Sequence, residues 1–240
     1  MNSLMNCPPA PRSLQPGTRA FSFIDLLVVM AVLAVLAAVA VPLFVKNRAG
    51  THLAQCLANV RQINHAAQMY ADDHQRRLPY MPNCPAPGAW WFYKEQVKGY
   101  LGLPGPSSRG DEVFACPDDR GYGESAETPQ PFHLSHKHDY TSYVFNSVDL
   151  PGIPSLAGRE LPAIRDPAKT LLVMEWTAHA PLSWHRSRTG RANTPFYNNA
   201  ESVVGFADGH AALIPIYFDG CNPAYTREPI PGYAYKYGGD

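Results

Sequence analysis

Hydrophobic and polar residues follow two different patterns along the first third of the chain. From Leu26 to Val45, twenty residues pass without a charged side chain. At about 1.5 Å per residue this run would form ~30 Å of helix, the hydrocarbon thickness of a bilayer. Beyond Val45, apolar residues recur at intervals of three and four, which predicts one helix from about Ser22 to Asp73. Its apolar stripe would consist of Leu53, Leu57, Val60, Ile63, Ala67 and Tyr70.

The chain after Arg77 has the pattern of short elements separated by long loops. Most of the 24 prolines and 18 glycines lie there, and both residues favour turns. The aromatic residues from Trp90 to Tyr93 could begin a short helix that runs to Tyr100. The segment from Tyr140 to Asn146 is rich in aromatic and β-branched residues, which predicts a strand.

Two later segments predict the rest of a sheet. Thr170 to Glu175 is an apolar run that ends in an acid, as expected of a central strand. Val203 to Ile214 contains Asp208-Gly209 between two apolar runs, which predicts a β-hairpin with a type I′ turn and positive φ at both central residues. We therefore expect an α+β protein, with a long N-terminal helix packed on a C-terminal antiparallel sheet that carries long loops.

The segment Ala20-Phe21-Ser22-Phe23-Ile24-Asp25 resembles the processing and methylation segment of type IV prepilins and type II secretion pseudopilins. In that family a peptidase cuts before a Phe, the new amino group is methylated, an acid stands fifth and a Pro twenty-second. Counted from Phe21, these positions hold Asp25 and Pro42. Ala20 replaces the usual Gly before the cut, and Asp25 replaces the usual Glu.

The resemblance implies a pilin-like subunit whose partners are a prepilin peptidase/N-methyltransferase, other pilin-like subunits and the inner membrane. The implied organisation is a cytoplasmic leader at 1–20, a transmembrane half-helix at 21–45, a soluble amphipathic half-helix at 46–77 and a β-rich head at 78–240. The head would lie in the periplasm or on a surface filament, and no enzyme activity is implied. Pro42 should kink or loosen the helix because it lacks an N–H group.

Short sequence motifs in the head resemble those of a pilin-like group common among planctomycete and verrucomicrobial proteins. They include Cys116-Pro117 and Asp208-Gly209-His210. That group usually has a His ten residues before the Asp, where this chain has Asn198.

Two other interpretations of the N-terminal segment remain open. It could be a secretory signal peptide cut after Ala38-Val39-Ala40. It could also be an anchor for an extracytoplasmic metal-binding or enzymatic domain. The closely spaced His133, His136 and His138 motivate the second idea, because His136 and His138 would share a face in an extended segment. The alternative is a group of loop histidines without a function.

Composition and charge restrict the remaining chemistry. The net charge is zero, so nucleic acid is not expected as a partner. No Gly-x-Ser-x-Gly, His-Glu-x-x-His or phosphate-loop motif occurs in the sequence, and an active site is not supported.

Cysteines and loop oxygens leave two kinds of site to consider. Without a leader, four cysteines remain as disulfide candidates, and we favour one or two bridges, with Cys84–Cys116 as one guess and free buried thiols as the alternative. These four are Cys56, Cys84, Cys116 and Cys221. Pseudopilins often hold a structural calcium, and Asp208, Asn198 and Asn199 offer the oxygen ligands that calcium prefers. Alternatively, Asp208 serves only its turn.

Overall fold

The computed structural model describes residues 23–81, 90–122, 130–147, 153–178, 182–185, 200–217 and 232–240, with the backbone alone for 42–49. The chain divides into two units, Met1–Lys46 and Asn47–Asp240. Six residues singled out in the sequence lie outside the described residues, namely Ala20, Phe21, Cys84, Asn198, Asn199 and Cys221.

The predicted long helix is confirmed as α1 (Phe23–Asp73). Its helical backbone continues through Pro42 and Gly50, and a kink at Pro42 stays a prediction. Within the second unit, one face of α1 is buried in the head, including Val60, Ile63 and Ala67 of the predicted stripe. The three- and four-residue spacing therefore located the buried face correctly.

The head contains a four-stranded antiparallel sheet with the strand order β1-β2-β3-β4. The strands are β1 (Tyr143–Phe145), β2 (Leu171–Glu175), β3 (Ala200–Phe206) and β4 (Ala211–Ile216). β2 is an interior strand and all five of its residues are buried, as its apolar sequence predicted. Pro215 lies in β4, an end strand of this sheet, where a residue without an N–H group is tolerated. The protein is thus α+β.

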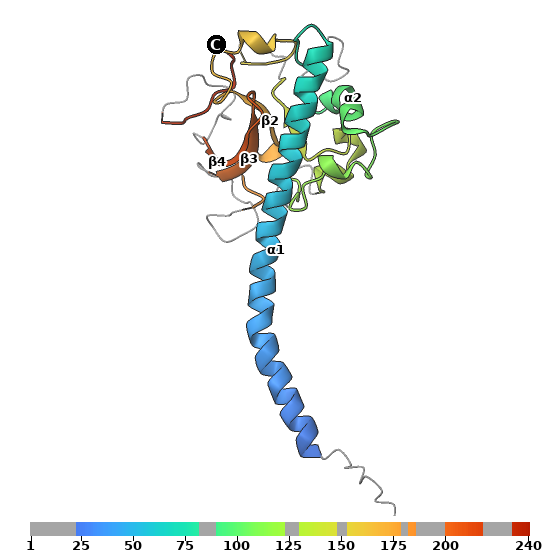
Figure 1. The fold of residues 1–240 in the computed structure, drawn as a ribbon, viewed down its shortest axis with the longest axis vertical. Helices are drawn as coiled ribbons and strands as arrows, with labels where there is room; N and C mark the ends of the chain where they lie inside the picture. The colour runs from blue at the N-terminus through green and yellow to red at the C-terminus, as the bar shows by residue number, and fades with distance from the viewer. Residues whose placement is uncertain are drawn as a thin grey trace, which may run out of the picture. The chain divides into compact units, whose positions relative to one another are not determined.

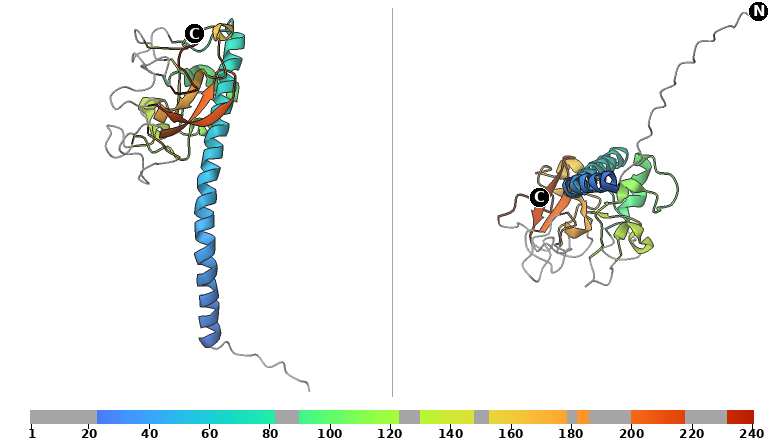
Figure 2. Two further views of the ribbon diagram at one scale, coloured as in Figure 1. Left: turned by 90° about the vertical axis from the view of Figure 1, so that its left-hand side faces the viewer. Right: turned by 90° about the horizontal axis from the view of Figure 1, so that it is seen from below.

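The second-unit part of α1 packs on this sheet and its hairpin (Figure 1). Gly205 of β3 makes the close approach possible, because a Cβ atom there would overlap the Asn64 side chain, whose Cγ would be 2.7 Å away. Asn64 Nδ2 donates to the carbonyl oxygens of Phe206 (3.2 Å) and His210 (3.4 Å). Gln68 Nε2 donates to the Ala207 carbonyl at 2.9 Å. In Figure 2 the strands lie against the teal part of α1.

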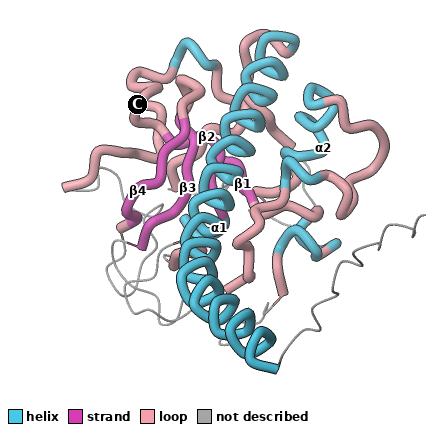
Figure 3. Tube along the Cα trace, turned by 60° about the horizontal axis from the view of Figure 1, so that its bottom comes forward, coloured by secondary structure: helices cyan, strands magenta, loops and turns pink. Residues whose placement is uncertain are grey.

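Short helices and loops complete the head on the other side of α1 (Figure 3). The predicted helix after Trp90 is present as α2 (Tyr93–Val97), which continues into the 3-10 helix η1 (Lys98–Leu101). The other 3-10 helices are η2 (Glu112–Phe114), η3 (Phe132–Leu134), η4 (His136–His138), η5 (Leu161–Ala163) and η6 (Trp176–Ala178).

Two local predictions need correction. The strand predicted from Tyr140 is shorter, because Asp139 and Tyr140 have left-handed φ values of 53° and 51° and pairing begins at Tyr143. The hairpin is present, but its turn is not type I′. Gly209 has a φ of 99° and Asp208 is not among the residues with positive φ. A three-residue connection, with the Gly209 N–H donating to the Phe206 carbonyl at 2.9 Å, replaces the two-residue turn.

Candidate functional site

The first-unit part of α1 places an acid at the start of an uncovered apolar helix. Asp25 lies in the first helical turn, where a negative charge interacts favourably with the helix dipole. From Phe23 to Val41 the helix has a mean hydropathy of 2.9, and none of its residues is buried within the structure. It is long and apolar enough to be a candidate membrane span.

The histidine cluster does not converge on a metal site. His136–His138 is a 3-10 helix, so the extended geometry expected for His136 and His138 is wrong. His133 Nδ1 instead contacts Asp119 Oδ2 at 3.0 Å. His138 Nδ1 contacts Ser135 Oγ at 3.0 Å, and its ring packs edge-on against Phe132 and Trp176. Burial lowers the pKa of His138 to about 4, so this side chain is neutral at physiological pH.

Asp208 serves its own hairpin. Its Oδ1 accepts hydrogen bonds from the His210 backbone N–H at 3.0 Å and contacts His210 Nδ1 at 2.6 Å. The His210 ring in turn stacks on Phe206, with centroids 4.1 Å apart. The described residues do not test the calcium prediction fully, because its other ligands, Asn198 and Asn199, lie outside them.

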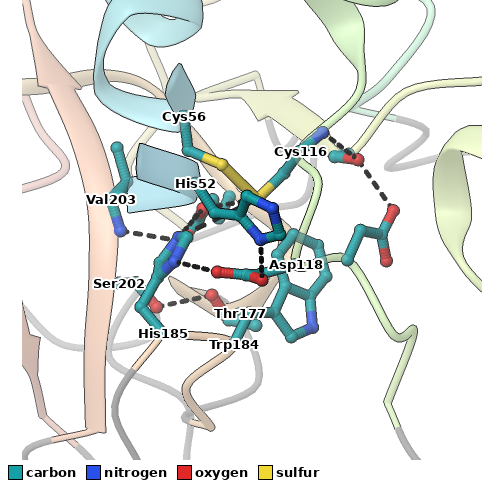
Figure 4. Close-up of polar contacts among 12 residues, drawn as sticks. His52, Cys56, Cys116, Asp118, Thr177, Trp184, His185, Ser202 and Val203 are labelled. Carbon is teal, nitrogen blue, oxygen red and sulfur yellow. Dashed lines mark hydrogen bonds and ion pairs between the residues drawn. A yellow bond between two sulfur atoms is a disulfide. The ribbon is translucent and has the colours of Figure 1, made fainter. Parts of the chain in front are cut away.

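The head contains a buried charged centre that the sequence did not predict (Figure 4). Glu175, the last residue of β2, is fully buried. Its Oε2 accepts a hydrogen bond from the Val203 backbone N–H of β3 at 2.8 Å. Its Oε1 lies 2.7 Å from His185 Nε2. A carboxylate is thus held between a neighbouring strand and an imidazole.

His185 lies between two carboxylates. Its Nδ1 is 3.0 Å from Asp118 Oδ2, and the other oxygen of Asp118 is 2.8 Å from His52 Nδ1 on α1. Since an ionised carboxylate only accepts hydrogen bonds, both nitrogens of His185 are donors, and the ring is an imidazolium. Burial alone would lower the pKa of His185, but the charges and hydrogen bonds of Glu175 and Asp118 outweigh it and raise the pKa.

Two hydrogen bonds fix the segment that carries His185. Trp184 is buried, and its Nε1 donates to the Gly121 carbonyl at 2.9 Å. Arg120 donates to the Trp184 carbonyl. The imidazole is therefore placed by the loop that contains Asp118.

A disulfide adjoins this centre. Cys56 of α1 is bonded to Cys116, with their Cα atoms 5.3 Å apart, so the guessed pairing Cys84–Cys116 is wrong. Cys116 Sγ lies 3.5 Å from Glu175 Oε1 and 3.8 Å from His185 Nε2. A disulfide sulfur carries no proton, so it cannot donate to Glu175, and toward His185 Nε2 it can act only as a weak acceptor. Figure 4 shows His185 and the disulfide side by side.

Within the described part of the chain, the two cysteines, Glu175 and His185 form a group of side chains that could bind a metal ion. The ligand atoms of Cys56, Cys116, Glu175 and His185 all lie within 4.8 Å of one another. We call this group the Cys-Glu-His cluster. Two partial signals for this cluster are present in the sequence, the acid at the end of an otherwise apolar strand and a cysteine on the buried face of a helix. Neither signal could reveal His185, since it follows a loop far from both.

A second buried acid stands next to the Cys-Glu-His cluster. Asp119 accepts hydrogen bonds from Ser142 Oγ at 2.7 Å and from the Gly121 N–H at 2.9 Å, besides its contact with His133. Ser142 Oγ also accepts from the Cys116 N–H at 2.9 Å. Asp118 and Asp119 thus hold histidine side chains and, in the case of Asp119, backbone groups.

Comparisons of this chain with protein-family models, with curated proteins and with solved structures found no match in any of the three.

Proposed function

We propose that this protein is a structural, pilin-like subunit that a prepilin peptidase cuts between Ala20 and Phe21 and that assembles into a pseudopilus or type IV pilus-like filament. The observation that carries the proposal is the exposed apolar segment Phe23–Val41, which begins with Asp25 in its first turn. The same α-helix continues into the head and ends at Asp73. A filament core built from such helices would cover the apolar side chains that this chain leaves uncovered.

Asp25 would set the axial register between neighbouring subunits of the filament. Cleavage after Ala20 creates an ammonium group on Phe21, four positions before Asp25. In an apolar setting, an uncompensated carboxylate is costly and a cationic partner is strongly attracted. If Asp25 of one subunit binds the amino terminus of its neighbour, the axial offset between subunits is fixed. Small residues at Ala31, Ala34 and Ala37 would allow the helices to approach closely.

Before assembly, the subunit would be inserted in the inner membrane. Phe23–Val41 would span the inner membrane once, and the basic leader at 1–20 would stay in the cytoplasm. The alternative of a tethered metal-binding domain loses the geometry that motivated it, because the three histidines of the loop do not converge.

Processing provides the first test. The full chain is produced with a prepilin peptidase/N-methyltransferase and its intact mass is measured. We expect a chain that begins with N-methylated Phe21. A chain that begins at Val41, after Ala38-Val39-Ala40, would identify a signal peptide and overturn the proposal, as would an unprocessed chain.

Assembly provides the second test, with a matched pair of variants. Asp25→Ala should be processed and inserted normally, but its yield in sheared, sedimentable filaments should fall at least about tenfold, because the charge pair is lost. Asp72→Ala removes an exposed acid of the same helix and should leave the yield unchanged. Equal filament yields from both variants would contradict the role given to Asp25.

A further inference from the structure

The Cys-Glu-His cluster has the composition of a zinc site as well as that of a disulfide beside an ion pair. Thiolate sulfur, imidazole nitrogen and carboxylate oxygen are the three ligand types that Zn²⁺ prefers. The cluster supplies four such atoms from α1, the loop before Asp118, β2 and the segment at 182–185. Four ligands from four segments form a closed set of the kind found in structural zinc sites.

The distances come close to those of a tetrahedral ion. With bonds of about 2.3 Å to sulfur and about 2.0–2.1 Å to nitrogen and oxygen, a tetrahedral Zn²⁺ holds its ligand atoms about 3.3–3.8 Å apart. Cys116 Sγ already lies 3.5 Å from Glu175 Oε1 and 3.8 Å from His185 Nε2. The nitrogen and oxygen, now 2.7 Å apart, need only a small separation. The two sulfurs separate when their bond is broken.

The surrounding hydrogen bonds would survive that change. Glu175 Oε1 and His185 Nε2 face the sulfur, while Glu175 Oε2 is held by the Val203 N–H and His185 Nδ1 by Asp118. A histidine ligand whose second nitrogen donates to a carboxylate is the usual outer arrangement of a zinc site. In the present state the imidazolium neutralises the buried Glu175, and Zn²⁺ would take over that role.

We propose that reduction of the Cys56–Cys116 disulfide converts the Cys-Glu-His cluster into a Zn²⁺ site, with Cys56 Sγ, Cys116 Sγ, Glu175 Oε1 and His185 Nε2 as ligands. A dithiol reductant supplies two electrons and two protons, its own sulfurs become a disulfide, and the bond between Cys56 and Cys116 breaks. Zn²⁺ then displaces both thiol protons and one proton of the His185 imidazolium. In reverse, a disulfide oxidant takes two electrons from the thiolates and two protons from water and becomes a dithiol. The Cys56–Cys116 bond re-forms, Zn²⁺ leaves and His185 takes up one proton.

The disulfide and the zinc site are therefore mutually exclusive states of one centre in the head. All four ligands lie in the second unit, Asn47–Asp240. The proposal consequently stands independently of whether the N-terminal segment is processed or assembles.

Cobalt titration of the full chain in detergent micelles tests the site. Cys7, Cys84 and Cys221 are replaced by serine, so that Cys56 and Cys116 are the two remaining cysteines. The protein is reduced with a phosphine, freed of reductant without oxygen and titrated with Co²⁺. We expect about one Co²⁺ per chain, with the thiolate-to-cobalt band and intense visible bands of a tetrahedral thiolate site, and its displacement by Zn²⁺. The oxidised protein should show no such bands.

Two histidine variants locate the site. His185→Gln removes a ligand and should weaken Co²⁺ binding at least about tenfold, whereas His210→Gln, in the exposed hairpin, should leave the affinity unchanged. Asp118 contacts the far nitrogen of His185 and also His52, and Asp118→Asn should weaken binding about 10- to 100-fold.

Three results would overturn the proposal. They are a reduced protein without a thiolate-to-cobalt band, equal affinities for the His185→Gln and His210→Gln variants, and a reduced protein that unfolds and is not restored by Zn²⁺. Near-ultraviolet circular dichroism of the reduced chain, with and without Zn²⁺, separates loss of the fold from loss of the site.

Discussion

The two parts of α1 use the same backbone structure for opposite purposes. In the first unit, Leu33 is 52% exposed and its neighbours are equally uncovered, although nearly all are apolar. In the second unit, Ile63 is fully buried, and so is the polar Asn64 beside it. Burial is therefore not decided by hydrophobicity alone. The second part has a sheet and loops of its own chain to cover it, whereas the first part is left exposed and is a candidate membrane span.

The two parts of α1 also use their polar residues differently. Asn64 and Gln68 point at the hairpin and hydrogen-bond its carbonyl groups, so their polarity is used inside the head. Asp25 begins a stretch that has no charged residue before Lys46. In the filament proposed above, its partner would be the new amino terminus of a neighbouring subunit.

The largest effect should come from removing a buried side chain of the second part. Ile63→Ala should lower the free energy of unfolding of the head by about 3 kcal/mol, because it removes buried methylene groups and leaves a cavity. The measurement is denaturant unfolding of the full chain in detergent, followed by tryptophan fluorescence. All four tryptophans lie in the head unit.

Leu33→Ala is the matched control on the same helix. It removes a similar amount of apolar surface from a side chain that the head does not cover, so the free energy of unfolding of the head should not change. A loss as large as that of Ile63→Ala would show that the first part packs on protein within the subunit.

A smaller effect should follow from a single methyl group at the contact between α1 and the sheet. Gly205→Ala would displace the Asn64 amide and weaken its two hydrogen bonds, which should destabilise the head by about 2 kcal/mol. Gly50→Ala makes the same substitution within α1, where a Cβ atom would meet nothing within 4 Å. It should stabilise the helix by about 0.5–1 kcal/mol. Shifts of the same sign in both variants would contradict the close approach.

The smallest effect concerns a half-buried acid of the head. Burial raises the pKa of Asp139 to about 6, against the opposing effect of Lys94. Because the folded-state pKa lies above the ordinary value of 3.8, the head loses stability as pH rises from about 4 through about 6.

Asp139→Asn should therefore stabilise the head by about 1 kcal/mol at pH 8, after allowance for solvent screening, and by nearly nothing at pH 4. Asn tolerates the left-handed conformation of this position. Unfolding curves at both pH values check the prediction, and a gain that does not depend on pH would contradict it. Asp72→Asn, an exposed control, should change stability by less than about 0.5 kcal/mol at either pH.

The sequence alone determined the elements whose signal is local and periodic. The long helix and its buried stripe follow from an apolar run and from spacings of three and four residues. The interior strand at Leu171–Glu175 follows from a continuous apolar run, and the hairpin from Asp208-Gly209 between two apolar runs. The processing segment at 20–25 is likewise a local sequence motif, and its role is a proposal. Local patterns fail where geometry is irregular, as at Asp139 and Tyr140, whose left-handed backbone moves the start of the predicted strand to Tyr143.

Only the tertiary structure decided the disulfide and the buried centre. Cys56 and Cys116 are 60 residues apart in sequence, and nothing in their spacing favours that pair over the other possible pairs. His185 meets Glu175 and Asp118 because the tertiary structure brings the segment at 182–185 beside the end of β2 and the segment that holds Asp118. Which polar groups come together depends on that long-range packing, since each group taken alone is as compatible with a solvated loop as with a buried site.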